Sequence, residues 1–84
     1  MIINKNPFAA MKKLEDEYYI ICNNKVFLLE GISPFIWDNI EDGVTLENLL
    51  EKILNEYDVS EKKARKDLEK IIARLEKIGA IDVD

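Results

Sequence analysis

The sequence predicts a small α+β domain in which two or three strands are followed by three helices. Residues 17–30 contain two short runs rich in aromatic and β-branched residues, a composition typical of strands. From residue 33 onward, apolar residues recur every three or four positions, as in amphipathic helices. The chain has 84 residues and no repeat, linker or low-complexity tract, so residues 1–84 are expected to form a single domain.

A hairpin accounts for the two clearest strands. Residues 17–22 and 25–30 flank Asn23-Asn24, and asparagine tolerates positive φ, so this pair suits a two-residue type I′ turn. Residues 8–14 fit a strand or a helix, but their length and their place before the hairpin favour a strand. Residues 1–7 are expected to be a lead-in with a turn or loop at "NKNP". The turn predicts the cross-strand pairs Cys22–Lys25, Ile20–Phe27 and Tyr18–Leu29.

The strand at residues 25–30 is apolar on both faces. Neighbouring side chains of a strand point to opposite faces, so Val26 and Leu28 share one face and Phe27 and Leu29 the other. Strands buried on both faces commonly have this composition, so each of the four residues is a candidate for the core.

The first helix is expected to begin with Ser33 as its N-cap and Pro34 in the first helical position. Gly43 is expected to end this segment. Trp37 is predicted to be a core anchor. The apolar face consists of Phe35, Ile36, Trp37 and Ile40.

Hydroxyl side chains predict where the other two helices begin. Thr45 is the expected N-cap of the second helix, which ends at "EYDV", and Ser60 caps the third and longest, which Gly79 ends. Residues 80–84 are expected to be a short tail that pairs or packs. The apolar stripes are Leu46, Leu49, Leu50, Ile53 and Leu54 in the second helix, and Ala64, Leu68, Ile71, Ile72, Leu75 and Ile78 in the third.

The composition excludes several classes of function. The net charge of −5 argues against a nucleic-acid partner, because neutralising phosphates takes clustered Lys and Arg. Without histidine and with Cys22 as the single cysteine, the chain has no metal-ligand cluster, internal disulfide or Ser–His pair. We therefore expect no enzymatic activity, metal or cofactor. We also expect a cytoplasmic protein with no membrane contact, because no signal peptide or membrane-spanning run is present.

Charge is segregated along the chain. Residues 38–58 contain seven acids and one base, whereas residues 60–78 contain seven bases and four acids. The last helix is therefore a basic element in an acidic protein. Lys63, Asp67, Lys70 and Arg74 flank one side of its apolar stripe. A solvated helix face is the ordinary interpretation of such a pattern.

The order and spacing of several short motifs resemble the PqqD-like proteins. A strand leads into an "IW" helix, Ile36-Trp37, which is followed by "DG" at Asp42-Gly43. The next helix ends in "YDV" at residues 57–59, and the last reads "DLEKIIARLEKIGAI" from Asp67 to Ile81, similar to the family's "DVxxFLxxLxxxGLI". The resemblance covers roughly residues 14–82, with conservative apolar replacements at Leu68, Ile71 and Ile72.

This resemblance implies a compact winged helix-turn-helix-like fold, with a three-stranded antiparallel sheet followed by three helices. The family includes recognition elements for ribosomally made, post-translationally modified peptides. These bind the leader segment of a precursor peptide as an added strand, in a groove between the third strand and the third helix. The leader-binding site would then consist of Lys25, Val26, Phe27, Leu28 and Leu29 on the strand, and Lys63, Asp67, Lys70, Ile71 and Arg74 on the last helix.

The favoured hypothesis is therefore a stand-alone adaptor that presents a precursor peptide to a modifying enzyme. A radical-SAM enzyme and a leader peptidase are both candidate partners. Two alternatives are a winged-helix DNA-binding regulator, which would use the basic last helix against a groove, and a small structural subunit of a larger enzyme. The acidic helix before the basic one argues against the DNA-binding alternative, because it would repel the phosphate backbone.

Overall fold

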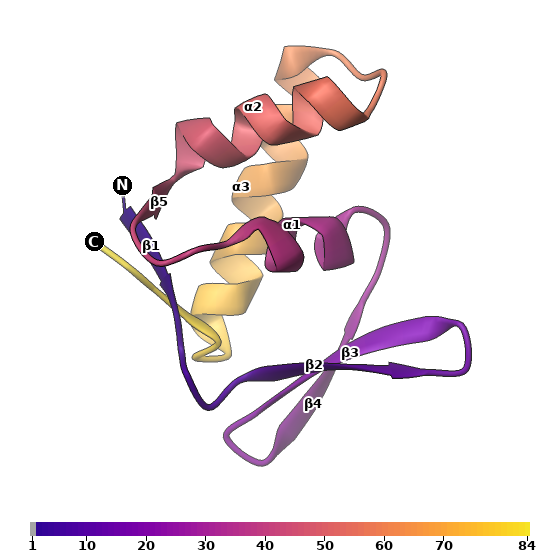
Figure 1. Cartoon of the computed structure of the whole chain (residues 1–84), viewed down its shortest axis with the longest axis vertical. Coiled ribbons are helices and arrows are strands. Elements are labelled where there is room, and N and C mark those ends of the chain that lie inside the picture. Colours follow the sequence, from indigo (N-terminus) through magenta and orange to yellow (C-terminus); the bar gives the residue numbers. More distant parts are fainter. Residues whose placement is uncertain (1) are drawn as a thin grey trace.

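The computed structural model describes residues 2–84 and contains two three-stranded antiparallel sheets and three helices (Figure 1). The predicted α+β class, with a three-stranded antiparallel sheet followed by three helices, is confirmed. The elements, in order, are β1 (Ile2–Lys5), β2 (Ala10–Leu14), β3 (Glu17–Cys22), β4 (Lys25–Leu29), α1 (Ser33–Asn39), β5 (Val44–Thr45), α2 (Leu46–Glu56), α3 (Glu61–Lys77) and β6 (Ile81–Val83).

The sheet β2-β3-β4 forms as the sequence predicts. Asn23 and Asn24 have φ of 53° and 63°, the positive values that a type I′ turn requires at both positions. The turn sets the predicted register, in which Cys22 pairs with Lys25 and Ile20 with Phe27. β2 pairs with β3 from Ala10 to Leu14, so the first predicted strand is present but begins two residues later than expected.

A second sheet, β5-β1-β6, was not predicted. The expectation of a lead-in with a loop at residues 1–7 is wrong for β1, whose Ile3 is fully buried. The predicted tail forms β6, which pairs antiparallel to β1. The two ends of the chain are joined by hydrogen bonds between Ile2 and Asp84, and they lie side by side (Figure 1).

The helices begin largely as predicted. The Thr45 side chain accepts a hydrogen bond from the Asn48 amide at the start of α2, and Ser60 accepts one from Lys63 at the start of α3. The capping role predicted for Ser33 is wrong, because α1 begins at Ser33 itself and Ile32 is the N-cap. α1 also ends at Asn39, four residues before Gly43.

The core lies among the three helices and takes buried side chains from both sheets. Ile20 of β3 and Leu29 of β4 pack into it from the sheet, and Trp37 is 4% exposed, as expected for a core anchor. Burial of these large side chains is the main stabilising contribution, at about 1.5–3 kcal/mol each. The largest fully buried side chains are Ile3, Ile20, Ile36, Ile40, Leu49, Ile53, Leu68 and Ile81, with Cys22.

The C-terminal end of α3 is tied to the hairpin turn. The Gly79 and Ala80 amides donate hydrogen bonds to the Glu76 and Leu75 carbonyls, a Schellman motif in which Gly79 has φ of +82°. The Asn23 side-chain amide donates to the carbonyl of Ile78, 3.4 Å away. The start of β4 is thereby held over the end of α3.

We expect Gly79→Ala to lower the free energy of unfolding by about 1–2 kcal/mol, because a left-handed φ is costly for alanine. Gly43→Ala is the matched control, since Gly43 also has φ of +82° but no neighbour within 4 Å of an added Cβ. A Cβ at Gly79 would lie 2.7 Å from Nδ2 of Asn23. Urea unfolding should show a loss of stability for both variants, while only Gly79→Ala shifts the NMR signal of the Asn23 side-chain amide. An unmoved Asn23 signal would contradict the described contact.

Candidate functional site: an open strand edge beside α3

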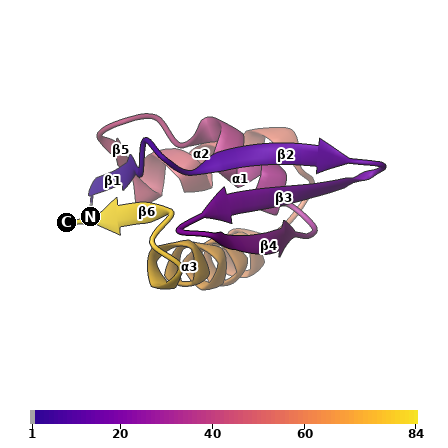
Figure 2. The same cartoon turned by 90° about the horizontal axis from the view of Figure 1, so that it is seen from below.

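β4 is an edge strand, and the edge faces α3. The sheet order is β2-β3-β4, and within residues 2–84 no strand pairs with the other side of β4. Figure 2 shows the three strands with α3 running alongside β4. An unpaired edge presents backbone N–H and C=O groups that another chain can use for strand pairing.

The hairpin register decides which residues of β4 present these groups. Lys25 follows a two-residue turn, so it forms a hydrogen-bonded pair with Cys22. Hydrogen-bonded and non-hydrogen-bonded pairs alternate along an antiparallel ladder. Phe27 and Leu29 therefore bond to β3, whereas the amides and carbonyls of Val26 and Leu28 point to the open edge.

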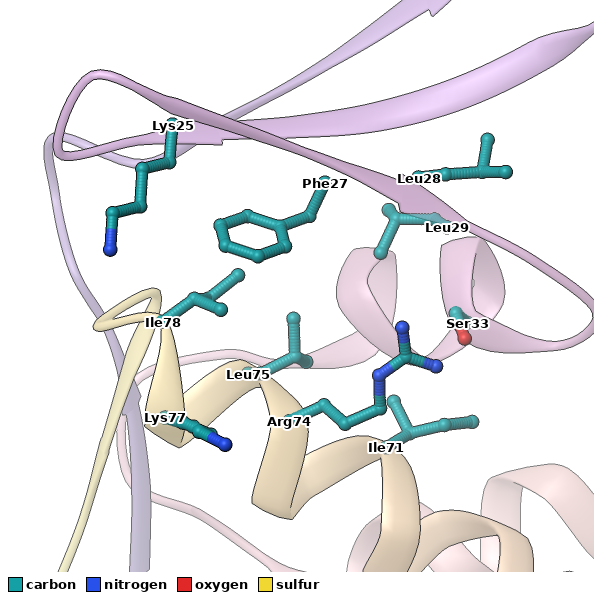
Figure 3. Close-up of a pocket in the computed structure, with 10 residues that line it drawn as sticks. All are labelled: Lys25, Phe27, Leu28, Leu29, Ser33, Ile71, Arg74, Leu75, Lys77 and Ile78. Carbon is teal, nitrogen blue, oxygen red and sulfur yellow. The ribbon is translucent and has the colours of Figure 1, made fainter.

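A groove of about 400 Å³ lies between β4 and α3 (Figure 3). This volume is at the low end for ligand pockets, so it suits a few side chains of an extended segment. Phe27 points from β4 toward α3, and Arg74 reaches from α3 toward β4 (Figure 3). The groove is lined by Lys25, Phe27, Leu28, Leu29, Ser33, Ile71, Arg74, Leu75, Lys77 and Ile78.

The groove has an apolar floor and a charged rim. Leu29 and Leu75 are buried at its base, and Phe27 is half-buried above them. Lys25, Arg74 and Lys77 are exposed around it. A few polar groups around an apolar surface are the usual composition of a binding site, in which apolar contact supplies affinity and polar groups fix orientation.

The structure brings together six of the ten predicted site residues. They come from two elements far apart in the sequence and line one groove: Lys25, Phe27, Leu28, Leu29, Ile71 and Arg74. Val26 does not line it, because its side chain is 61% exposed on the opposite face of the sheet, where core burial had been one interpretation. Its backbone still lies on the open edge.

The remaining three predicted residues line a separate basic cavity toward the start of α3. Lys63, Asp67 and Lys70 are there, with Ser60, Lys62 and Lys66. The Lys63 ammonium lies 3.4 Å from the Asp67 carboxylate, one helical turn away. These residues are therefore neighbours of the groove along α3 and do not form its walls.

Sequence reasoning missed four residues of the groove. Leu75 and Ile78 had been assigned to the core stripe, and Lys77 had been counted only as a base. Leu75 lies four positions from Ile71, and Lys77 and Ile78 lie three and four positions from Arg74. Helical spacing from the predicted site residues was therefore the available signal. Ser33 had been assigned to capping, which hid its position beside the groove.

One cation of α3 is already engaged by α2. The Arg65 guanidinium donates hydrogen bonds to both carboxylate oxygens of Glu47, at 2.8 and 3.3 Å. These bonds lower the pKa of the Glu47 carboxyl, so the pair is intact near neutral pH and is lost as the pH falls through that pKa. Arg65 therefore links α3 to α2 through an exposed ion pair.

Within residues 2–84, no group of three His, Cys, Asp or Glu side chains is arranged to hold a metal ion. None of the helices formed by these residues has the length and apolar character needed to cross a membrane. Lys5 lies over the ring of Trp37, 4.5 Å from its centroid, and burial lowers the pKa of its ammonium group. This cation–π contact connects β1 with α1.

Comparison with known proteins gives two matches. A family model described as "Coenzyme PQQ synthesis protein D (PqqD)" matches residues 11–81. A solved structure entitled "TbiB1 in Complex with the TbiA(beta) Leader Peptide" superposes with a TM-score of 0.79, covering 95% of each chain at 20% sequence identity. No curated protein sequence matches the chain.

Proposed function

This chain belongs to the PqqD family, and from that membership and the groove beside β4 we propose that it is a non-catalytic adaptor for a precursor peptide. It binds the leader segment of a ribosomally made peptide and presents the remainder to a modifying enzyme. The observation that carries the proposal is the unpaired edge of β4 beside an apolar groove. The match to a solved structure of a protein in complex with a leader peptide supports it.

The leader adds to the sheet as a fourth strand next to β4. Its backbone pairs with the outward amides and carbonyls of Val26 and Leu28. These main-chain hydrogen bonds do not depend on the leader's sequence, and each contributes a net stabilisation of about 0.5–1.5 kcal/mol. Specificity then comes from alternate side chains of the leader, because every second one points into the groove.

The side chains of the groove add apolar contacts to the main-chain hydrogen bonds made at the edge of β4. Phe27 and Ile71, both half-buried, offer apolar surface that a leader side chain can cover. Burying such surface gives roughly 25 cal/mol per Å². Lys63, Asp67 and Lys70 contact the leader only where it continues along α3 beyond the groove.

The second partner is a peptide-modifying enzyme, of the radical-SAM or leader-peptidase kind, acting in the cytoplasm. The chain has no histidine and therefore no Ser–His or Cys–His pair of its own, and the chemistry is assigned to that enzyme. The adaptor raises the effective concentration of the precursor at the enzyme by binding both.

The test uses a candidate precursor peptide and a candidate modifying enzyme chosen from the genes that neighbour this one. The enzyme is incubated with the full precursor, with and without the adaptor, and with a precursor that lacks its leader. We expect the adaptor to accelerate modification of the full precursor at low substrate concentration and to leave the leaderless peptide unaffected. Equal acceleration of both peptides would contradict leader binding.

The DNA-binding alternative is tested by a band shift at low salt with random-sequence duplex. We expect no shift, because Glu47 and the other acids of α2 lie beside α3 and repel phosphates. A shift that weakens steeply with added salt would favour the regulator.

A further inference from the structure

The groove is lined by charges of a single sign. The lining has three charged side chains, and all are cations: Lys25, Arg74 and Lys77. Within residues 2–84 none of the three has an ion-pair partner, although the ion pairs of Lys63 and Arg65 show that α3 cations do engage carboxylates within reach. The protein carries a net charge of −5, so this clustering opposes the overall composition.

Basic side chains also line the surface of α3 toward its N-terminal end. The neighbouring cavity is lined by Ser60, Lys62, Lys63, Lys66, Asp67 and Lys70. Its one carboxylate, Asp67, already pairs with Lys63. Lys70 and Arg74 are four residues apart, so they occupy the same side of the helix and connect the two cavities.

The spacing of an added strand matches the spacing of these cations. Side chains i and i+2 of a strand share a face and lie roughly 6.5 Å apart. Residues three or four apart on a helix face lie roughly 5–6 Å apart. Arg74 is three residues from Ile71 and four from Ile78, so a leader side chain over either one places an i±2 neighbour within reach of Arg74. Lys77 and Lys70, three and four residues from Arg74, lie on the same side of the helix.

We propose that the leader recognised by this protein is an acidic segment with an apolar anchor, in which Asp or Glu lies two residues from the aliphatic or aromatic side chain that enters the groove. Further acidic residues follow along α3 toward Lys70. This inference rests on the proposed leader binding and names the chemistry of the segment. Exposed ion pairs of this kind contribute about two- to fivefold each in affinity and weaken as salt screens them.

The test is a display selection of random 12-residue peptides on the immobilised protein. We expect the enriched peptides to carry Asp or Glu two positions from a Leu, Ile, Phe or Tyr. The variant Arg74→Glu with Lys77→Glu should enrich Lys or Arg at that position instead. The control Lys12→Glu with Lys52→Glu makes the same change of net charge on surfaces outside the groove and should return the acidic motif.

The outcomes separate this inference from leader binding itself. Amide NMR titration with an enriched peptide shows whether it binds at Val26 and Leu28 of β4. Peptides that bind there without any acidic preference, or with the same preference on the charge-reversed variant, overturn the inference and leave strand addition standing. Peptides that bind elsewhere overturn the proposed function, and the inference with it.

Discussion

Replacing Leu28 with proline is expected to weaken leader binding by at least about tenfold while the domain stays folded. Proline has no N–H, and the Leu28 amide points to the open edge, so the change removes a hydrogen bond to the leader and places a ring where the added strand would lie. Proline is tolerated on edge strands whose N–H faces outward. Isothermal titration with the leader peptide measures the loss.

Two companion variants make this prediction specific to the backbone. Leu28→Val keeps the amide and should bind within about threefold of the parent chain. Phe27→Pro, one residue away, removes an N–H that bonds to β3 and should destabilise the fold by about 3 kcal/mol or more. Circular dichroism checks folding in each case. If folded Leu28→Pro binds as well as Leu28→Val, the edge of β4 is not where the leader pairs.

Ile3→Ala is expected to lower the free energy of unfolding by about 2–5 kcal/mol. Ile3 is fully buried in β1 between β5 and β6, so the shorter side chain leaves a cavity. Ile2→Ala is the matched control, because Ile2 is 43% exposed and should lose less than about 1 kcal/mol. Urea unfolding of the two variants gives the comparison.

A loss of that size is a large fraction of the stability of a domain of this length, which is typically about 5–15 kcal/mol. Ile3→Val, at about 0.5–1.5 kcal/mol, keeps the measurement possible if Ile3→Ala does not fold. Similar values for Ile2→Ala and Ile3→Ala would mean that the N-terminal segment is a loose lead-in and not a strand of the second sheet.

The hairpin and the two longer helices were predictable because their signals are local. Asn23-Asn24 selects the turn type, and the turn fixes the register of β3 and β4. Thr45 and Ser60 cap the helices from positions next to them in the sequence. Each of these features is decided within a few residues, which is the range over which sequence patterns are informative.

The second sheet could not be predicted on that basis. β1 pairs with β6, its partner from the opposite end of the chain, and β5 has only two residues. The run Ile2–Lys5 has two apolar residues followed by Asn and Lys, which is too short and too polar to show a strand period. β1 is stabilised by the burial of Ile3 against elements that are distant in sequence, and local sequence patterns do not predict that burial.

The groove between β4 and α3 was predictable in outline and not in detail. The doubly apolar composition of β4 does not indicate which face meets the helices, and so Val26 was included although its side chain faces away from the groove. The flank of α3 was predicted as one surface, but the fold separates Lys63, Asp67 and Lys70 from the groove. Which residues of α3 lie beside β4 depends on how both elements pack against the core, and that packing is a property of the tertiary structure.

Amide hydrogen exchange at Val26 and Leu28 tests the central claim most directly. In the protein alone, these two amides should exchange quickly, while those of Phe27 and Leu29, bonded to β3, should exchange slowly. Saturating leader peptide should slow Val26 and Leu28 strongly, because both amides become part of a ladder. Exchange at Val26 and Leu28 that is already slow without peptide, or that is unchanged by a peptide shown to bind, would contradict strand addition at this edge.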